Sequence, residues 1–529
     1  MSRKVFLREA TGLVRGFSTA DTIILAIGNI VGPSWVPAFA AMWFIFPGVN
    51  IPLSFVLCAA IGVFHGLYYA LITTVMPRSG GGTYIPLSRA IHPLLGMAMS
   101  SILVVSLMFN LGLIASIIVT VAIASPLTTF GTITSNTGLQ TLGSMLSTPT
   151  WALVAGSLVI FLVGLIAVAG VRVVRIVNKI AFIVGTVGMV AMVAVLVTLS
   201  QPQFQSAFNS FAGAGQYENI IATAHASGWS VPSNYLTPTL LSLPLTFFMI
   251  IGYQTNTYYA GEIKRVNRNV PIAVLASILY AAFFYSIIAT LMTNSFGADF
   301  ITSAGYLFNA VPSKYPLSIA PWVNNFITIA NSSPIVLGLV IANFVSFGYL
   351  IIMTFYVIIS RQFLAWAFDR AIPSFFGEVS SRFHTPVRAI IITGVVGWIA
   401  LLLYIYAGPV TSTVNIAFML IVSWLLDGLA GIAIVRKKHL WDSAPPIVKR
   451  KIGGIPVIAL LGAYGVVFMT LLFIASLYNP AVIGPFGLST ATTIVIAVIL
   501  GLSSLLSMKA YLKRKGLDIS MVFSEIPPE

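Results

Sequence analysis

The residues best placed to do chemistry lie where glycine and proline interrupt two long apolar segments. Gly28-Asn29-Ile30-Val31-Gly32-Pro33-Ser34 interrupts the segment 17–46, and Phe247-Phe248-Met249-Ile250-Ile251-Gly252 interrupts a second segment halfway along the chain. Proline has no backbone N–H, and a bilayer has no water to satisfy the backbone groups that a broken helix frees. Such groups must face protein or a cavity, where they can hold a substrate or an ion. We therefore interpret the two breaks as one binding site.

Two ionisable residues inside other apolar segments are further candidates. His65 lies in the segment 49–76, and Asp427 lies in the segment 410–435. Ionisable groups within a membrane are candidates for function. His65 could carry a proton, or it could be a neutral histidine bonded between helices. Asp427 could be a proton carrier or a capped structural carboxylate.

Composition indicates a multi-pass membrane protein. Of the 529 residues, 58% are hydrophobic and only 7% are charged, whereas a soluble domain carries about 25% charged residues. Cys58 is the single cysteine, which excludes an intramolecular disulfide. The first apolar segment follows four basic residues and has no small-residue cleavage site, so we expect an uncleaved first helix.

The placement of basic residues predicts the topology. Twelve apolar segments are expected at 17–46, 49–76, 94–125, 151–171, 177–200, 237–262, 270–293, 334–360, 387–406, 410–435, 454–477 and 486–508. With the N-terminus inside, 26 of the 27 basic residues fall on the inner side, and only Lys314 falls outside. The positive-inside rule then places both termini in the cytoplasm of a cell-membrane protein. The charge of +15 is explained by topology and lipid headgroups rather than by nucleic acid.

The same pattern divides the chain into seven parts. They are a cytoplasmic N-terminus (1–16), a first half of five helices (17–200), an extracytoplasmic loop (201–236), a second half (237–435), a cytoplasmic loop (436–453), two last helices (454–508) and a cytoplasmic tail (509–529). Short surface helices are expected within 201–236 and 294–333. Gly32 and Gly252 hold corresponding places in the two halves, which suggests an inverted repeat.

Four motifs resemble the amino acid–polyamine–organocation superfamily of secondary transporters. They are Gly28–Gly32; Pro77-Arg78-Ser79-Gly80-Gly81-Gly82-Thr83-Tyr84 with Ser88-Arg89-Ala90; Gly261-Glu262-Ile263-Lys264 with Arg268-Asn269-Val270-Pro271; and Ser360-Arg361 through Asp369, Ile372-Pro373 and Thr385-Pro386-Val387. The resemblance covers about residues 12–390. It implies an all-α fold of about 12 membrane helices: a five-plus-five inverted repeat with broken helices one and six, and two peripheral helices.

The resemblance also implies how a substrate is held. Backbone N–H groups near Gly32, Pro33 and Ser34 would bind a carboxylate at a half-helix N-terminus. Pro33 departs from the family pattern because it lacks the N–H, which favours an amine or an unusual acid. The alternative is a proline kink without a ligand.

The remaining substrate contacts are implied at both breaks. Carbonyls near Ile27, Gly28, Ile30, Phe247, Phe248 and Ile251 would accept from an ammonium group beside Gly252. Phe248 would be an aromatic lid, or alternatively an ordinary lipid- or core-facing ring. Gln254 would be a polar contact, and Phe355 would line the distal pocket.

The family's usual coupling groups are mostly missing. Gly185 stands where some members carry a lysine, and Leu71 and Gln254 stand where others carry carboxylates. A sodium site would use the carbonyls of Gly28 and Val31 with the Thr354 hydroxyl, since oxygen ligands suit a hard cation. Alternatively, that hydroxyl bonds back to its own helix. His65 and Asp427 remain as proton candidates, and no cofactor or other metal is expected.

A cytoplasmic gate is expected from Glu262, Arg268, Arg361 and Asp369, which family members pair when the inner side is shut. The alternative is solvated helix ends, where exposed pairs contribute little, about 0–1 kcal/mol each.

The expected function is ion-coupled transport of amino acids or amines by alternating access, with protons favoured over sodium. The alternatives are an obligate exchanger and a non-transporting sensor. An enzyme is disfavoured because the five histidines are scattered and the one cysteine has no partner. A channel would need repeated filter loops, which we do not find.

Overall fold

A computed structural model describes residues 13–77, 80–407, 416–478 and 488–525 of the chain. Arg78 and Ser79 of the second motif, parts of both predicted cytoplasmic ends, and the first residues of the tenth and twelfth predicted segments lie outside the described residues. Nearly all described elements are helical. The two strands found among them, β1 (Lys451–Ile452) and β2 (Ile455–Pro456), form a small antiparallel hairpin.

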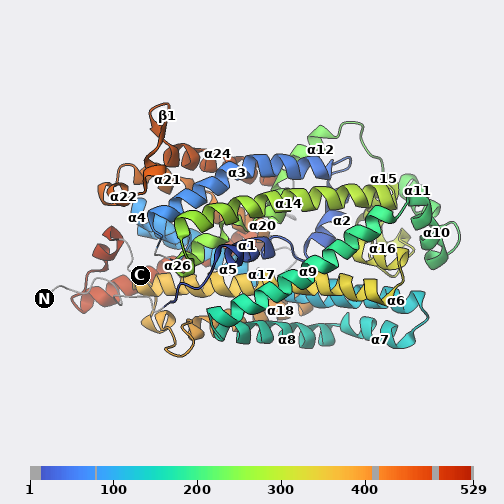
Figure 1. Ribbon diagram of the computed structural model, residues 1–529, viewed down its shortest axis with the longest axis horizontal. Coiled ribbons are helices and arrows are strands. Elements are labelled where there is room, and N and C mark those ends of the chain that lie inside the picture. Colours follow the sequence, from blue (N-terminus) through green and yellow to red (C-terminus); the bar gives the residue numbers. More distant parts are fainter. Residues whose placement is uncertain (1–12, 78–79, 408–415, 479–487, 526–529) are drawn as a thin grey trace.

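Ten helical stretches in the described residues are long and apolar enough to cross a membrane. They are α3 (Ile51–Val75), α5 to α6 (Pro93–Ile133), α8 (Pro149–Val168), α9 (Val171–Thr198), α14 (Val266–Phe296), α17 (Pro334–Phe368), α18 (Val387–Tyr406), α20 to α21 (Ile416–Ile434), α24 (Val457–Tyr478) and α26 (Leu488–Arg514). Several of them run side by side along the long axis of the molecule (Figure 1). They confirm the predicted all-α membrane fold.

The two predicted breaks account for the other two apolar segments. The first segment forms α1 (Thr19–Gly28) and α2 (Trp35–Ile45), with residues 29–34 irregular between them. The second forms α12 (Leu236–Leu241), α13 (Leu243–Ile250) and the 3-10 helix η2 (Tyr253–Glu262). Both helices therefore end where the glycines and the proline predict.

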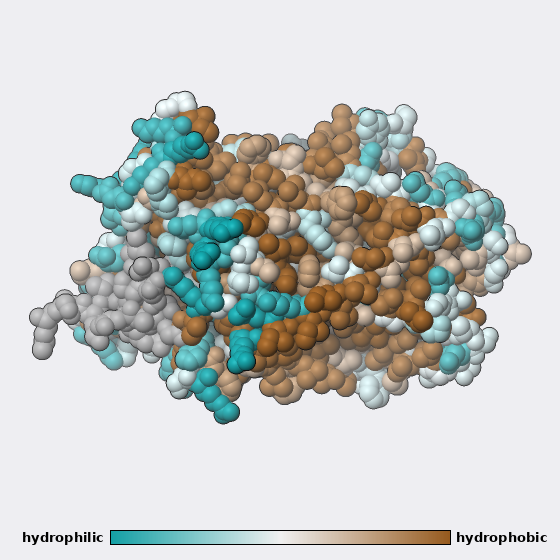
Figure 2. Space-filling view, viewed as in Figure 1, coloured by the Kyte–Doolittle hydropathy of each residue, from teal (hydrophilic) through white to brown (hydrophobic). Residues whose placement is uncertain are grey.

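The surface separates into an apolar middle and two polar ends. Figure 2 shows a broad hydrophobic region between hydrophilic clusters. Apolar side chains on the membrane-length helices are exposed, and Phe161 of α8, Ile183 of α9 and Phe283 of α14 are each more than half exposed. The end that carries α4 (Tyr84–Ala90), α22 (Lys438–Ser443) and β1 is called the basic end here. The helix α15 (Ala298–Ala310) lies at the opposite end (Figure 1), and η3 (Pro312–Lys314), which contains Lys314, follows it directly along the chain.

Short helices cover the opposite end, and one of them differs from expectation. The helices α7 (Thr137–Leu146), α10 (Gln201–Ala212), α11 (Gln216–Ala226) and α15 lie there. However, α16 (Val323–Ala330) is buried rather than on the surface. Its Asn324 Nδ2 donates to the carbonyl of Val121, 2.7 Å away, in the π-helical stretch η1 (Ile118–Ala124). A π-helix shifts backbone hydrogen bonds out of register, so this asparagine satisfies a buried acceptor.

The basic end joins the start of the first broken segment to the end of the second. Phe17 and Ile263 form a parallel β-bridge, and the amides of Gly16 and Phe17 both donate to the Glu262 carbonyl over 3.0 Å. The cytoplasmic loop expected before the fifth helix is shorter than predicted, because α9 begins at Val171. The Arg175 side chain of α9 then reaches Asp21 of α1, with 2.7 Å between Nε and Oδ2.

Candidate functional site

The two helix breaks face each other in the interior. Gly252 has a φ of +146°, and a Cβ placed there would lie 2.8 Å from Ile30 Cγ1 and 2.9 Å from Asn29 Nδ2. Only glycine combines that backbone conformation with such a close approach. The glycine that interrupts the second segment is therefore also what lets the two breaks touch.

A cavity of about 50 Å³ lies beside this contact. A single water needs about 10–15 Å³ on the same measure, so the cavity has room for a few waters. Six of the predicted substrate residues line it: Ile30, Ser34, Phe248, Ile251, Gln254 and Phe355. Phe248 is half-buried and lies on the cavity wall.

The other predicted substrate residues serve packing in this structure. Gly28 and Gly32 allow the first break to press against α17, where an added Cβ on Gly28 would lie 2.7 Å from Leu350 Cβ. Pro33 also lies against α17, beside Gly348. Phe247 is fully buried and packs edge-on against Phe468, with ring centroids 5.2 Å apart.

The carbonyls expected to receive an ammonium group are partly occupied. The Tyr285 hydroxyl donates to the Ile30 carbonyl over 2.8 Å, and the amides of Ile30 and Val31 both donate to the Ile27 carbonyl. By contrast, Asn29 Oδ1 is buried without a hydrogen-bond partner in the described residues, and Asn29 lines the cavity. A buried acceptor without a donor is costly, so Asn29 is a better candidate acceptor than the backbone.

Several cavity residues were not predicted from the sequence. They are Asn29, Trp35, Asn110, Thr255, Tyr258, Tyr285, Leu420 and Trp424, from both breaks and from α5, α14 and α20. Asn110, a lone amide inside an apolar helix, could have been noticed. The large aromatic residues gave no signal, because this sequence contains 35 Phe, 19 Tyr and 9 Trp.

The described residues of the cavity wall carry no charge. The polar side chains of the wall are amides and hydroxyls from Asn29, Ser34, Asn110, Gln254 and Thr255. Most of the wall is aliphatic or aromatic, as in sites that bind small molecules through a few placed polar groups. Such a wall can orient polar ends by hydrogen bonds and cover an apolar group.

The residues proposed for sodium coupling lie away from this wall. The Thr354 hydroxyl donates to the Leu350 carbonyl of its own helix over 2.8 Å, which is the alternative considered above. Gly185 is used in helix packing, since Asn343 Nδ2 donates to its carbonyl over 2.7 Å. Gly28 and Val31 are buried in the first break.

His65 and Asp427 are both buried between helices. His65 Nδ1 is 2.7 Å from the Tyr253 hydroxyl, and aromatic rings of Tyr69 and Phe468 pack around it. Asp427 Oδ2 accepts a 2.6 Å hydrogen bond from the Tyr69 hydroxyl. His65 lines none of the described cavities, whereas Asp427 lines a small one.

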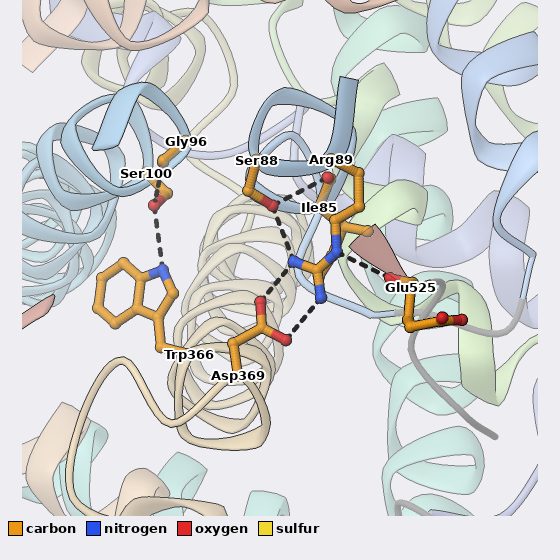
Figure 3. Close-up of polar contacts among 8 residues, drawn as sticks. All are labelled: Ile85, Ser88, Arg89, Gly96, Ser100, Trp366, Asp369 and Glu525. Carbon is orange, nitrogen blue, oxygen red and sulfur yellow. Dashed lines mark hydrogen bonds and ion pairs between the residues drawn. The ribbon is translucent and has the colours of Figure 1, made fainter. Parts of the chain in front are cut away.

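Two buried ion pairs lie among the residues predicted to form the cytoplasmic gate. Arg361 Nε and Nη2 lie 2.7 and 3.0 Å from the two carboxylate oxygens of Glu262. Arg89 forms a two-pronged pair with Asp369, with 2.6 Å between Nη2 and Oδ1 (Figure 3). Both side chains of each pair are at most 4% exposed. Solvated helix ends are therefore the wrong interpretation for these residues.

The two buried ion pairs differ in their members from the gate expected from the sequence. Arg268 is exposed and forms none of the ion pairs found in the described residues. Arg89 takes part instead, and its guanidinium also donates to Ser88 Oγ and to the Glu525 carbonyl (Figure 3). Sequence reasoning had placed Arg89 in a motif without giving it a partner. Its carboxylate partner lies 280 residues away.

A second close glycine contact joins the loop before α4 to η2. Gly82 has a φ of +51°, and a Cβ there would overlap the ring of Tyr258 in η2. The Gly81 amide donates to the Tyr258 carbonyl over 3.1 Å. The glycine run of the second motif thus lets the loop before α4 lie directly on the second broken segment.

The long apolar helices define a multi-pass membrane protein. Residues 17–504 match the sequence model of the amino acid permease family, and the chain belongs to this family. It is also 25% identical over 177 residues to the vacuolar cationic amino acid transporter 4 of Arabidopsis thaliana. That match covers 32% of this chain and 26% of the relative. The family match confirms the resemblance drawn from the motifs.

Proposed function

We propose that the protein is a secondary active transporter that moves amino acids or related amines across the cell membrane by alternating access. The observation that carries this proposal is the buried cavity between the two helix breaks. A bilayer tolerates broken helices where they line such a cavity. The proposal takes the buried ion pairs Arg89–Asp369 and Glu262–Arg361 as the closed cytoplasmic gate. We assign the basic end, with both termini, to the cytoplasm because the positive-inside rule places the loops rich in lysine and arginine on that side of the membrane.

Within this substrate class we propose an amino acid with an uncharged side chain, whose own carboxylate balances its ammonium group. The relative in Arabidopsis is named for cationic amino acids, but no carboxylate lies among the described residues of this cavity. A buried cationic side chain without a counterion would be strongly disfavoured. The aromatic walls favour an aliphatic or aromatic group. Asn29 Oδ1 would accept from the substrate ammonium group, and Ser34 would donate to a carboxylate in place of the missing Pro33 amide.

We propose coupling to protons rather than sodium. Thr354 is bonded to its own helix, so the expected hydroxyl ligand for sodium is engaged elsewhere. The missing lysine and carboxylates also fit an obligate exchanger, which needs no coupling ion. Lipid headgroups would contact the exposed basic residues of the inner loops.

Uptake into proteoliposomes tests these statements together. Labelled neutral, cationic and acidic amino acids and amines are each offered with an inward proton gradient, with a sodium gradient, and with unlabelled substrate inside. We expect proton-driven uptake of an amino acid with an uncharged side chain. Uptake only into preloaded vesicles would establish the exchanger. Thermal stabilisation by a substrate without any uptake would establish a sensor and refute transport.

A further inference from the structure

A second, smaller cavity lies beside Asp427, separate from the substrate cavity. Its volume is about 20 Å³, enough for one water molecule. Its walls come from α3, from the loop before α4, from η2 and from the junction of α20 and α21. The polar residues of the wall are Tyr68, Tyr69, Thr73, Thr83, Thr257 and Asp427.

The Asp427 carboxylate is only half satisfied. Asp427 is buried, with only 1% of its surface exposed. Oδ2 accepts from the Tyr69 hydroxyl, and the backbone carbonyl accepts from the Tyr68 hydroxyl. Oδ1 is buried and has no hydrogen-bond partner in the described residues. One oxygen with unused acceptor capacity therefore belongs to a residue that lines a water-sized space.

No described cation balances this carboxylate. The titratable groups that face it are the hydroxyls of Tyr68, Tyr69 and Tyr258. The other ionisable groups on the helices packed around it are engaged elsewhere: His65 of α3 with Tyr253, Glu262 of η2 with Arg361, and Arg89 of α4 with Asp369. The helix α24 contains no acidic, basic or histidine residue. An ionised carboxylate in such a place is costly unless a cation joins it.

The backbone at Asp427 is irregular. Three residues separate the end of α20 (Ile416–Trp424) from the start of α21 (Gly428–Ile434). The Asp427 amide donates to the Trp424 carbonyl over 3.2 Å, and the Ala430 amide donates to the Asp427 carbonyl over 3.0 Å. These are i to i−3 bonds, and a short 3-10 stretch inside a helix often marks a hinge.

The small cavity and the substrate cavity are lined by neighbouring residues of the same segments: Asp427 and Thr257 line the first, and Trp424 and Tyr258 line the second. The Trp424 indole N–H donates to the Tyr258 hydroxyl over 3.2 Å, and both side chains line the substrate cavity. Thr257, next to Tyr258, lines the small cavity. A change of occupant or charge at Asp427 would therefore act on two walls of the substrate cavity.

We propose that Asp427 is the site of the coupling proton, an inference that rests on the transport function proposed above. A proton from water binds Oδ1 and is released to water on the other side when the transporter changes state. No electron transfer or other reactant is involved. A proton needs only one oxygen, whereas sodium would need several ligands. Among the described wall residues, Asp427 Oδ1 is the only buried polar side-chain atom without a hydrogen-bond partner. The Thr73 and Thr257 hydroxyls already donate to the carbonyls of Tyr69 and Gln254.

The test separates proton movement from substrate movement. Wild type, Asp427→Asn, Asp427→Glu and the control Asp442→Asn are placed in vesicles that hold a pH-sensitive dye. Asp442 is exposed on α22, so its substitution controls for the loss of one acidic side chain. Proton influx is recorded when the neutral amino acid accepted by the wild type is added, and counterflow of the same substrate is recorded without any gradient.

We expect Asp427→Asn to lose substrate-driven proton influx while counterflow persists. Asp427→Glu and Asp442→Asn should keep both activities. Proton influx retained in Asp427→Asn would overturn the inference, as would proton-independent uptake in the wild type or uptake driven by sodium. Loss of counterflow and of substrate-induced thermal stabilisation in Asp427→Asn would also overturn it, by making Asp427 part of substrate binding. Wild-type vesicles that exchange no substrate would instead refute transport itself.

Discussion

Breaking the buried pair of Arg89 and Asp369 should open the basic end. Asp369→Asn removes the charge but keeps one oxygen near the Arg89 guanidinium. Removing one partner of a fully buried pair costs about 3–5 kcal/mol, because the remaining charge is left uncompensated. Opening this end would hydrate Arg89 and relieve that cost, so the substitution favours the open state.

The structure narrows the expected free-energy change caused by Asp369→Asn. Arg89 keeps two weaker acceptors, Ser88 Oγ at 2.8 Å and the Glu525 carbonyl at 3.4 Å. We therefore expect the lower end of the range, about 3 kcal/mol. Since about 1.4 kcal/mol corresponds to a factor of ten, the ratio of open to closed protein should rise roughly a hundredfold.

Labelling of a single cysteine measures this change. Cys58 is the only cysteine, so Cys58→Ala with Thr83→Cys gives one reporter at a position that is 5% exposed in the closed state. The rate of reaction with a polar maleimide should rise in proportion to the open fraction. The control is Glu378→Gln, which breaks an ion pair to Arg388 that is more than half exposed and should contribute only about 0–1 kcal/mol.

Equal labelling rates in Asp369→Asn and Glu378→Gln would refute the gate. A lowered melting temperature without faster labelling would show that the pair stabilises the fold as a whole, and would also contradict a gating role.

Three further perturbations test the breaks and the cavity. Gly252→Ala should abolish transport because an added Cβ would clash with Asn29 and Ile30. Gly228→Ala is the control and should keep transport, since Gly228 also has a positive φ but an added Cβ there would have nothing within 4 Å. Uptake and melting curves of both variants separate the effect of the steric clash from that of backbone strain. Phe248→Ala and Ser34→Ala should each impair uptake while expression is kept, and wild-type kinetics in both would remove the proposed site. Thr354→Ala should leave uptake equal in sodium and choline buffers, because its hydroxyl is bonded to its own helix; a sodium dependence lost in this variant would restore the sodium site.

The sequence alone determined the membrane fold and the position of the breaks. Hydropathy is a local property, so each apolar segment could be found without knowing its neighbours. The breaks are also local, because glycine and proline act on the backbone where they stand. For the same reason Ser34, Phe248 and Gln254 could be placed near the site, since they lie within a few residues of a break.

Tertiary structure decided which groups meet. The partner of Asp369 is Arg89, which lies 280 residues away, and no local pattern encodes that pairing. The Ile30 carbonyl accepts a hydrogen bond from the Tyr285 hydroxyl of α14. Asn29 Oδ1 is buried and has no hydrogen-bond partner in the described residues, so it remains available to accept from a ligand. Asp427 was a candidate from its position in an apolar segment, but its unpartnered oxygen and the water-sized cavity arise only where four separate elements pack together. The sequence fixes what each segment can do, and packing selects the groups that remain available to a ligand.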